Sequence, residues 1–369
     1  MIWLWAGFLA FIAVLLVLDL GILHRKNEAV PAKSALKWVA FFVLLGALFN
    51  VGVYFIYENN WLNSGERFSE QIRRFEAAKL VSAGKLPADM AATWTPPPES
   101  AAAKDMSRPG RTAAVQFLTG WLTEYSLSVD NIFVIALIFT HFRVAPKYQH
   151  RVLFWGILGA LAMRGAMILT GTALIARFHW LIYLFGAFLI FTAIKMVLAG
   201  DGGEVDFENR RIIRWARKLI PMSPTYHGSH FFTRIDGRLM ATPMLLVLLV
   251  VETTDVIFAL DSIPAILGIT TDPFLVFTSN VFAILGLRSL FFALSGLMDK
   301  FHYLKYSLAL ILGFVGAKML LEVPAIGVEI SSTVSLMVIG GVLAMGVIAS
   351  LAHAGRAKSA ELPDVPQEH

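Results

Sequence analysis

Five acidic residues fall inside stretches of sequence that are otherwise apolar. One stretch carries Glu124 and Asp130, and a second carries Glu252, Asp255 and Asp261. Insertion of an acidic side chain at the centre of a membrane helix costs roughly 2.5–3.5 kcal/mol, so five of them cannot face lipid. They must face each other, water or cations, and carboxylates inside a membrane are functional by default. The sequence therefore predicts a cation site built from these side chains.

Helical spacing brings several of these groups onto common faces. At 100° per residue, Glu252 and Asp255 lie about 60° apart, and Glu124 and Ser128 lie about 40° apart. Each stretch thus presents a row of oxygen atoms. Pro264 has no backbone N–H, which frees the carbonyl four residues earlier, next to the last acid of the second stretch. A freed carbonyl that lines a cavity can coordinate a cation.

Further candidate ligands flank these acids. Asn131 and Asn280 offer neutral oxygens, whereas Asp19 is as consistent with an interfacial ion pair to Arg25 as with a role in the site. The chain has no cysteine, and its nine histidines fall in loops, tails or span ends. Hard oxygen ligands favour Mg²⁺, Ca²⁺ or Mn²⁺ over zinc or copper.

Structural ion pairing is the alternative reading of these acids. The apolar stretches also contain Arg164, Arg288, Lys195 and Lys318. Four bases balance at most four of five acids, so pairing alone leaves one acid over. We expect the two arginines to form ion pairs and the two lysines, which lie near span ends, to reach toward the membrane surface. The carboxylates as a group are interpreted as a cation site.

The composition is that of a membrane protein. Of 369 residues, 57% are hydrophobic and 15% are charged, against about 25% charged in soluble domains. A helix needs about 20 apolar residues to cross a bilayer, and such runs recur along the chain. We therefore predict an all-α integral membrane fold with about nine transmembrane helices, at residues 2–23, 35–57, 113–139, 152–175, 178–199, 243–267, 274–297, 304–321 and 332–351.

Basic residues mark the predicted cytoplasmic side. They concentrate in the odd-numbered connections and the C-terminal tail, which places the N-terminus outside and the C-terminus inside. Because these residues lie between apolar spans, the net charge of +5 does not indicate nucleic-acid binding. The predicted organisation is two helices (1–57), an extracytoplasmic loop (58–112), a first three-helix unit (113–199), a basic cytoplasmic loop (200–242), a second three-helix unit (243–321), a last helix (322–351) and a cytoplasmic tail (352–369).

The long connection 58–112 allows two readings. Phe68, Ile72 and Phe75 recur at helical spacing, which is compatible with a short amphipathic helix before the Pro-rich stretch 96–98. The connection also carries many charged residues of both signs. We expect a solvated arm.

Three landmarks repeat along the chain in the same order. The Asp-x-Ile-Phe motif occurs at 130 and 255, an intramembrane arginine at 164 and 288, and a Lys-Met pair at 195 and 318. The offsets are 255 − 130 = 125, 288 − 164 = 124 and 318 − 195 = 123. Each unit has three spans, so the second copy enters from the opposite side. We predict an inverted repeat, a transporter architecture with its site near the midplane between the copies.

The acidic motifs resemble those of the TerC family of membrane proteins, particularly its Alx-like bacterial branch. The resemblance covers roughly residues 1–350 and is carried by the motif 124–131, by 252–265 and by Thr278-Ser-Asn280 followed by Gly286-Leu-Arg288. The family is associated with tellurium resistance by name and with manganese efflux by function. The resemblance implies Mn²⁺ export across a bacterial inner membrane, with metal homeostasis as its role and Asp130, Asp255 and Asp261 in the matching motifs.

Three functions of different class compete. The favoured one is a secondary transporter that exports Mn²⁺, with proton exchange as its candidate coupling. Its partners are divalent metal and the lipid bilayer, and it has no resident cofactor and no ATP-binding loop. The second is a non-transporting membrane scaffold or a redox or stress modulator. The third is an intramembrane aspartyl protease, which is disfavoured because no Gly-x-Gly-Asp element lies on a span. We expect no enzyme activity.

Overall fold

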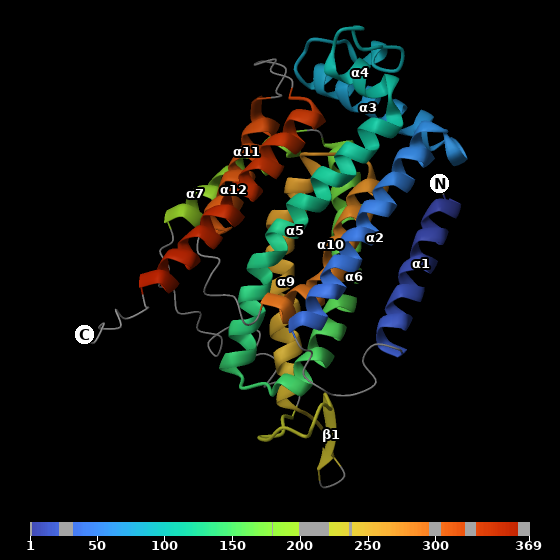
Figure 1. Cartoon of the computed structure of the whole chain (residues 1–369). Coiled ribbons are helices and arrows are strands. Elements are labelled where there is room, and N and C mark those ends of the chain that lie inside the picture. Colours follow the sequence, from blue (N-terminus) through green and yellow to red (C-terminus); the bar gives the residue numbers. More distant parts are fainter. Residues whose placement is uncertain are drawn as a thin grey trace, which may run out of the picture.

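The protein is a bundle of long helices with a small cap at one end (Figure 1). The computed structural model describes residues 2–21, 32–178, 180–198, 221–235, 238–294, 304–321 and 330–360. Within these residues the bundle helices are α1 (Ile2–Gly21), α2 (Ala32–Glu58), α5 (Pro109–His141), α6 (Pro146–Arg177), α7 (Leu181–Leu198), α9 (Pro243–Leu267), α10 (Pro273–Leu294), α11 (Leu304–Leu321) and α12 (Ser332–Ala360).

The helix boundaries follow local signals in the sequence. Four bundle helices begin at a proline, namely Pro109, Pro146, Pro243 and Pro273. Proline suits the first helical position because the N–H it lacks would have no partner there. Helices α9 and α11 have the bounds predicted for their spans. Inside α9 the helix continues through Pro264 to Leu267, so the proline removes one hydrogen bond without ending the helix.

The bundle helices have the length and composition of membrane spans. Among the described residues, six helices are long and apolar enough to cross a bilayer: α2, α6, α7, α9, α10 and α12. Segments 2–17 and 306–321 are shorter apolar helices. Phe191, Ile194 and Leu198 of α7 are exposed, as expected of a surface that faces lipid. The protein is therefore a multi-pass membrane protein, and the count of nine spans stays a prediction.

Helix packing crosses between the two predicted three-helix units. Helix α5 of the first unit packs on α10 of the second, α6 packs on α9, and α7 packs on α11. The first helix of each unit thus contacts the second helix of the other unit. This reciprocal pattern is what two related units facing each other would produce. The inverted repeat itself stays a prediction.

The connection 58–112 folds onto the bundle, so the expected solvated arm is wrong. It forms α3 (Ser64–Ser82), α4 (Ala101–Ser107) and the short turns η1 (Trp61–Asn63) and η2 (Ala88–Met90). Phe68 and Ala77 of α3 are only 2% and 1% exposed, because the apolar face of the amphipathic helix lies against the bundle. We call residues 59–108 the cap and this end of the bundle the cap end.

The opposite end carries a small hairpin that the sequence did not predict. Strands β1 (Phe232–Ile235) and β2 (Arg238–Ala241) pair antiparallel, with Thr233 opposite Met240. In Figure 1 helix α1 begins toward the cap end, and α12 runs from the cap end away from it.

Candidate cation site inside the bundle

A buried arginine joins the two acidic helices. Arg164 of α6 is 2% exposed. It forms an ion pair with Glu124 of α5, which is fully buried. Its Nη2 and Nε also donate to Oδ1 and Oδ2 of Asp255 on α9, at 2.8 and 3.2 Å. The expected pairing role of Arg164 is confirmed, and its guanidinium bridges the first helices of the two units.

The contacts of Arg164 with two carboxylates explain how its buried guanidinium is tolerated. Removing charged groups from water costs several kcal/mol each, and attraction offsets this only with good geometry and additional hydrogen bonds. The planar guanidinium donates in a fork that matches a carboxylate, and here it uses that fork on Asp255 while also reaching Glu124. The trio of one base and two acids still carries one net negative charge when all three are ionised.

A cavity of about 50 Å³ lies beside this trio and is lined from both units. We call it the inner cavity. Its polar lining consists of Glu124, Asn131, Arg164, Asp261 and Ser262. Several of its oxygen atoms, namely Glu124 Oε2, Asn131 Oδ1 and Ser262 Oγ, have no hydrogen-bond partner among the described residues. Buried polar atoms without partners are rare in folded proteins and indicate bound water or an ion.

Asp261 is oriented by a neighbouring helix. The hydroxyl of Thr192 on α7 donates to Asp261 Oδ1 at 3.1 Å. One carboxylate oxygen is thereby engaged, and the side chain is held at the edge of the inner cavity. The residue order alone predicted neither Thr192 nor Ser262. Ser262 directly follows a predicted acid and could have been included, whereas nothing in the sequence singles out Thr192.

A smaller cavity, of about 30 Å³, lies on another side of the same arginine. It is lined by Ser128, Arg164, Asp255 and Arg288 together with apolar side chains. Nη1 of Arg288 lies 3.2 Å from Nε2 of His150. Arg164 is the polar residue common to both cavities. Arg164 therefore contacts both cavities. Asp255 lines the smaller one, whereas Glu124 and Asp261 line the inner cavity.

Glu252 packs against a neighbouring helix. It is half-buried, and a Cβ built on Gly159 of α6 would overlap its carboxylate. The glycine therefore provides the space that Glu252 occupies. Glu252 lines neither cavity.

The remaining predicted ligands are less informative. Asn280 is 1% exposed on α10, lines neither cavity, and its Nδ2 has no hydrogen-bond partner among the described residues. The side chains of Asp130 and Asp19 lie outside the described residues. Among the side chains that are described, no three carboxylates or imidazoles gather closely enough to hold a metal ion by themselves. The grouping of all predicted acids into one site stays a prediction.

One predicted lysine departs from expectation. Lys318 was expected to reach the membrane surface, but it is 4% exposed and lines a cavity under the cap. Lys195 is exposed, as expected. The cap explains the difference, because it covers the end of α11 where a membrane surface would otherwise begin.

The fold and the site define a multi-pass helical membrane protein with a charged, water-sized cavity between two halves of its bundle. The chain belongs to the integral membrane protein TerC family, whose model matches residues 110–358.

Two relatives align with almost the whole chain. An "Uncharacterized membrane protein STKORF319" of Myxococcus xanthus is 45% identical over 364 residues, which cover 99% of this chain and 96% of the relative. A "Putative membrane-bound redox modulator Alx" of Escherichia coli (strain K12) is 41% identical over 346 residues, covering 94% and 93%. No solved structure matches the chain.

Proposed function

We propose that the protein exports divalent cations, Mn²⁺ in particular, through the inner cavity in exchange for protons. The observation that carries the proposal is the set of buried oxygens of Glu124, Asn131 and Ser262 that have no hydrogen-bond partner among the described residues. With Asp261 they bring two carboxylates and two neutral oxygens to one small space. Water molecules can complete the coordination of an ion held this way.

Charge balance supports a divalent ion. Among the described residues, the ionised groups that line the inner cavity or contact its lining arginine are the carboxylates of Glu124, Asp255 and Asp261 and the guanidinium of Arg164. Lys195 also acts on Asp261, but its side chain is exposed and does not line the cavity. The three negative charges and one positive charge of the first set leave two negative charges. One divalent cation balances them, and so do two protons. This equivalence is the basis for proposing proton exchange.

Ligand chemistry and family resemblance contribute different parts of the proposal. Carboxylate, amide and hydroxyl oxygens favour Mg²⁺, Ca²⁺ and Mn²⁺. The choice of Mn²⁺ among these comes from the association of the TerC family with manganese efflux. In this proposal the ion is cargo, and the protein has neither a resident cofactor nor an enzymatic reaction.

Arg164 acts in this proposal as a tethered cation. Its ion pair with Glu124 competes with any cargo that uses the same carboxylate. Arrival of a divalent ion weakens that ion pair, whereas departure of the ion restores it. The site therefore never exposes several uncompensated carboxylates to a low-dielectric interior.

The charge distribution supports a direction of transport. The basic connections are the reason for proposing that the hairpin end is cytoplasmic and that the cap lies outside the inner membrane of a bacterium. Reporter fusions after residue 351 and within the cap test this assignment. An externally accessible tag after residue 351 would overturn it.

The test of export compares carboxylate variants in cells that lack their other manganese exporters. Asp130→Asn, Asp255→Asn and Asp261→Asn keep side-chain size and remove charge, so each should abolish the lowering of cellular manganese. Asp89→Asn, at an exposed cap position, is the matched control and should export like wild type. If all three intramembrane variants export as well as wild type at equal expression, the carboxylates are structural.

The name of the Escherichia coli relative suggests a second candidate, a redox modulator that does not transport. This chain has no cysteine, so such a role would need chemistry other than its own thiols. Purified protein in liposomes separates the candidates. Manganese uptake by liposomes containing this protein alone supports transport, whereas its absence under a proton gradient favours the second candidate.

A further inference from the structure

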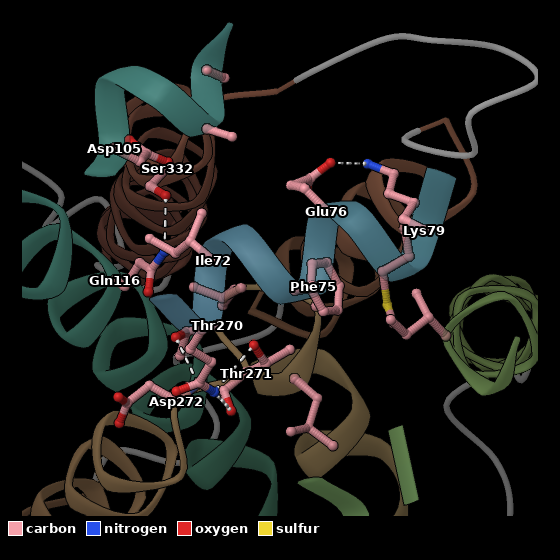
Figure 2. A pocket seen from close by; sticks show the side chains of 18 of the residues that line it. Ile72, Phe75, Glu76, Lys79, Asp105, Gln116, Thr270, Thr271, Asp272 and Ser332 are labelled. Atoms are coloured by element: carbon pink, nitrogen blue, oxygen red, sulfur yellow. Dashed lines mark hydrogen bonds and ion pairs between the residues drawn. The ribbon is translucent and has the colours of Figure 1, made fainter. Parts of the chain in front are cut away.

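A further polar cavity lies under the cap, as Figure 2 shows. Its volume is about 130 Å³. Helix α3 lines it with Gln71, Glu76 and Lys79, and the bundle lines it with residues that include Gln116 and Asp272. We call it the cap chamber.

The cap chamber and the inner cavity share four helices, α5, α7, α9 and α11, and on α7 their linings are 196 − 183 = 13 residues apart, at Tyr183 and Met196. On the other three helices the linings are closer. Helix α5 contributes Gln116 to the cap chamber and Glu124 to the inner cavity, α9 contributes Leu267 and Ser262, and α11 contributes Met319 and Leu312. The separations are 124 − 116 = 8, 267 − 262 = 5 and 319 − 312 = 7 residues. At 1.5 Å per residue these correspond to about 12, 8 and 10 Å. The chamber is therefore the next polar space toward the cap end.

A thin apolar layer separates the two spaces. A Cβ built on Gly268 would lie 2.8 Å from Sδ of Met319 and 2.9 Å from Cγ1 of Val315. The turn after α9 thus packs tightly on α11 at the floor of the chamber. Small movements of α9 or α11 would change this contact, because there is no free space at Gly268.

The chamber has the polarity of a wet space. Gln116 is 8% exposed, its Nε2 donates to Oγ of Ser332 at 3.4 Å, and its Oε1 has no partner among the described residues. The lining also includes Glu76, Asp105 and Asp272. A buried carbonyl oxygen without a donor is stabilised by water or a cation.

Helix α3 covers the chamber, and besides the bond from Ser64 Oγ to the backbone oxygen of Ile56 on α2 it contacts the turn after α9. Nε2 of Gln71 donates to the backbone oxygen of Thr271 at 2.7 Å. Thr271 lies in the turn between α9, which carries Asp261, and α10. The cover is thus attached to the helix that supplies cargo ligands, and movement of one is transmitted to the other.

We propose that the cap chamber is the vestibule at the outer end of the ion path and that α3 is its lid, which must lift from the α9–α10 turn for a hydrated divalent cation to pass. The identity of the cargo rests on the proposed function, whereas the vestibule does not.

Thiol labelling tests the vestibule without reference to any ion, because the chain has no cysteine of its own. Ser332→Cys lies at the chamber, and Ser350→Cys lies on the same helix and is fully buried. A membrane-impermeant maleimide applied from the cap side should label the first variant and not the second. Failure to label Ser332→Cys in intact cells and in inverted vesicles would overturn the vestibule.

Cross-linking tests the lid. Gln71→Cys with Thr271→Cys joins α3 to the bundle, whereas Ser69→Cys with Met106→Cys joins α3 to α4, where Ser69 Oγ and Met106 O lie 3.3 Å apart. Oxidation should reduce manganese export at least tenfold in the first pair, reversibly with reductant, and leave the second pair unchanged. Equal export by both oxidised pairs would overturn the lid. If wild type exports no manganese while Ser332→Cys is labelled, the proposed function fails and the vestibule stands.

Discussion

The inner cavity and the cap chamber share helices α5, α7, α9 and α11 but handle charge differently. In and beside the inner cavity, Glu124 and Asp255 share the guanidinium of Arg164, Asp261 accepts from Thr192, and several oxygens have no partner among the described residues. In the cap chamber, acids and lysines are mixed, as in the pair of Lys79 and Glu76 at 3.5 Å. A space that selects an ion needs uncompensated ligands, whereas a space that only admits it does not. Under the proposed function, the inner cavity would select the ion and the cap chamber would give access to it.

Removal of Arg164 should have the largest effect. Arg164→Ala leaves Glu124 and Asp255 buried without their shared base, and breaking a buried pair in this way costs about 3–5 kcal/mol of unfolding free energy. Arg177→Ala, at an exposed position at the end of the same helix, is the matched control. Unfolding in detergent measures both.

Neutralising the whole trio sharpens this prediction. Arg164→Gln combined with Glu124→Gln and Asp255→Asn should recover most of the lost stability while export stays absent. If Arg164→Ala is no less stable than Arg177→Ala, the inner cavity does not depend on the guanidinium and the comparison fails.

A methyl group on α6 should disturb Glu252 specifically. In Gly159→Ala the new Cβ occupies the place of the Glu252 carboxylate, which must move. Overpacking of this kind costs about 1–3 kcal/mol, and we expect export to fall severalfold. Gly156→Ala is the control, because its Cβ would meet Cγ1 of Val251 at an ordinary 3.4 Å. Equal export by the two variants would mean that the position of Glu252 has no effect on transport.

At the floor of the cap chamber, Asp272 should matter for stability. Its Oδ1 accepts from the backbone N–H groups of Phe274 and Leu275 at 2.9 and 3.0 Å, which caps α10. Loss of such a cap costs about 0.5–2 kcal/mol, so Asp272→Ala should lower the free energy of unfolding by that amount. Tyr57→Phe removes a longer bond of 3.4 Å to the same oxygen and should cost less. A larger loss for Tyr57→Phe would contradict this assignment.

The smallest effects should come from the exposed side of the cap. Arg73 and Arg74 both bind Glu70, but Arg73 also donates to the backbone oxygens of Ala91 and Trp94, both at 3.1 Å. Arg73→Ala should therefore speed proteolysis of segment 83–100, whereas Arg74→Ala should change it little, since an exposed i,i+4 pair contributes about 0.3–0.5 kcal/mol. Equal proteolysis of both variants would show that the carbonyl contacts do not hold the segment.

The pH dependence of this cap network has a defined sign. Hydrogen bonds from Arg73 and Arg74 lower the pKa of Glu70 to about 2. A lowered carboxyl pKa adds stability above the ordinary value of about 4.3, and this stability is lost as pH falls toward 2. Cap proteolysis should thus be insensitive to pH between 5 and 8, and the Arg74→Ala variant should lose protection at a higher pH than wild type.

Local sequence predicted the helices and the charged interior, and long-range packing decided the rest. The bounds of α9 and the ion pairing of Arg164 followed from apolar runs and from the cost of a lone charge in a membrane. Which acids share a cavity depends on how α5 and α9 rotate against each other. No single-helix pattern encodes such a rotation. The same holds for α7 against α9, so Thr192 of α7 could not be predicted as the partner of Asp261.

The cap illustrates the same limit. The spacing of Phe68, Ile72 and Phe75 was visible, but the surrounding charges suggested solvent. The surface that receives this face lies far along the chain, since Gln71 and Thr271 are separated by 200 residues. An amphipathic pattern indicates that a helix needs a partner without identifying it.

The ion pair between the two units also has a consequence for biosynthesis. Arg164 is synthesised 91 residues before Asp255, which at 5–20 residues per second is roughly 5–18 seconds. Of the two acids that contact Arg164, Glu124 is already present during that interval and Asp255 is not. Until α9 is made, Glu124 alone balances Arg164 in this contact. We therefore expect α5 to α7 to stay at the translocon until α9 arrives.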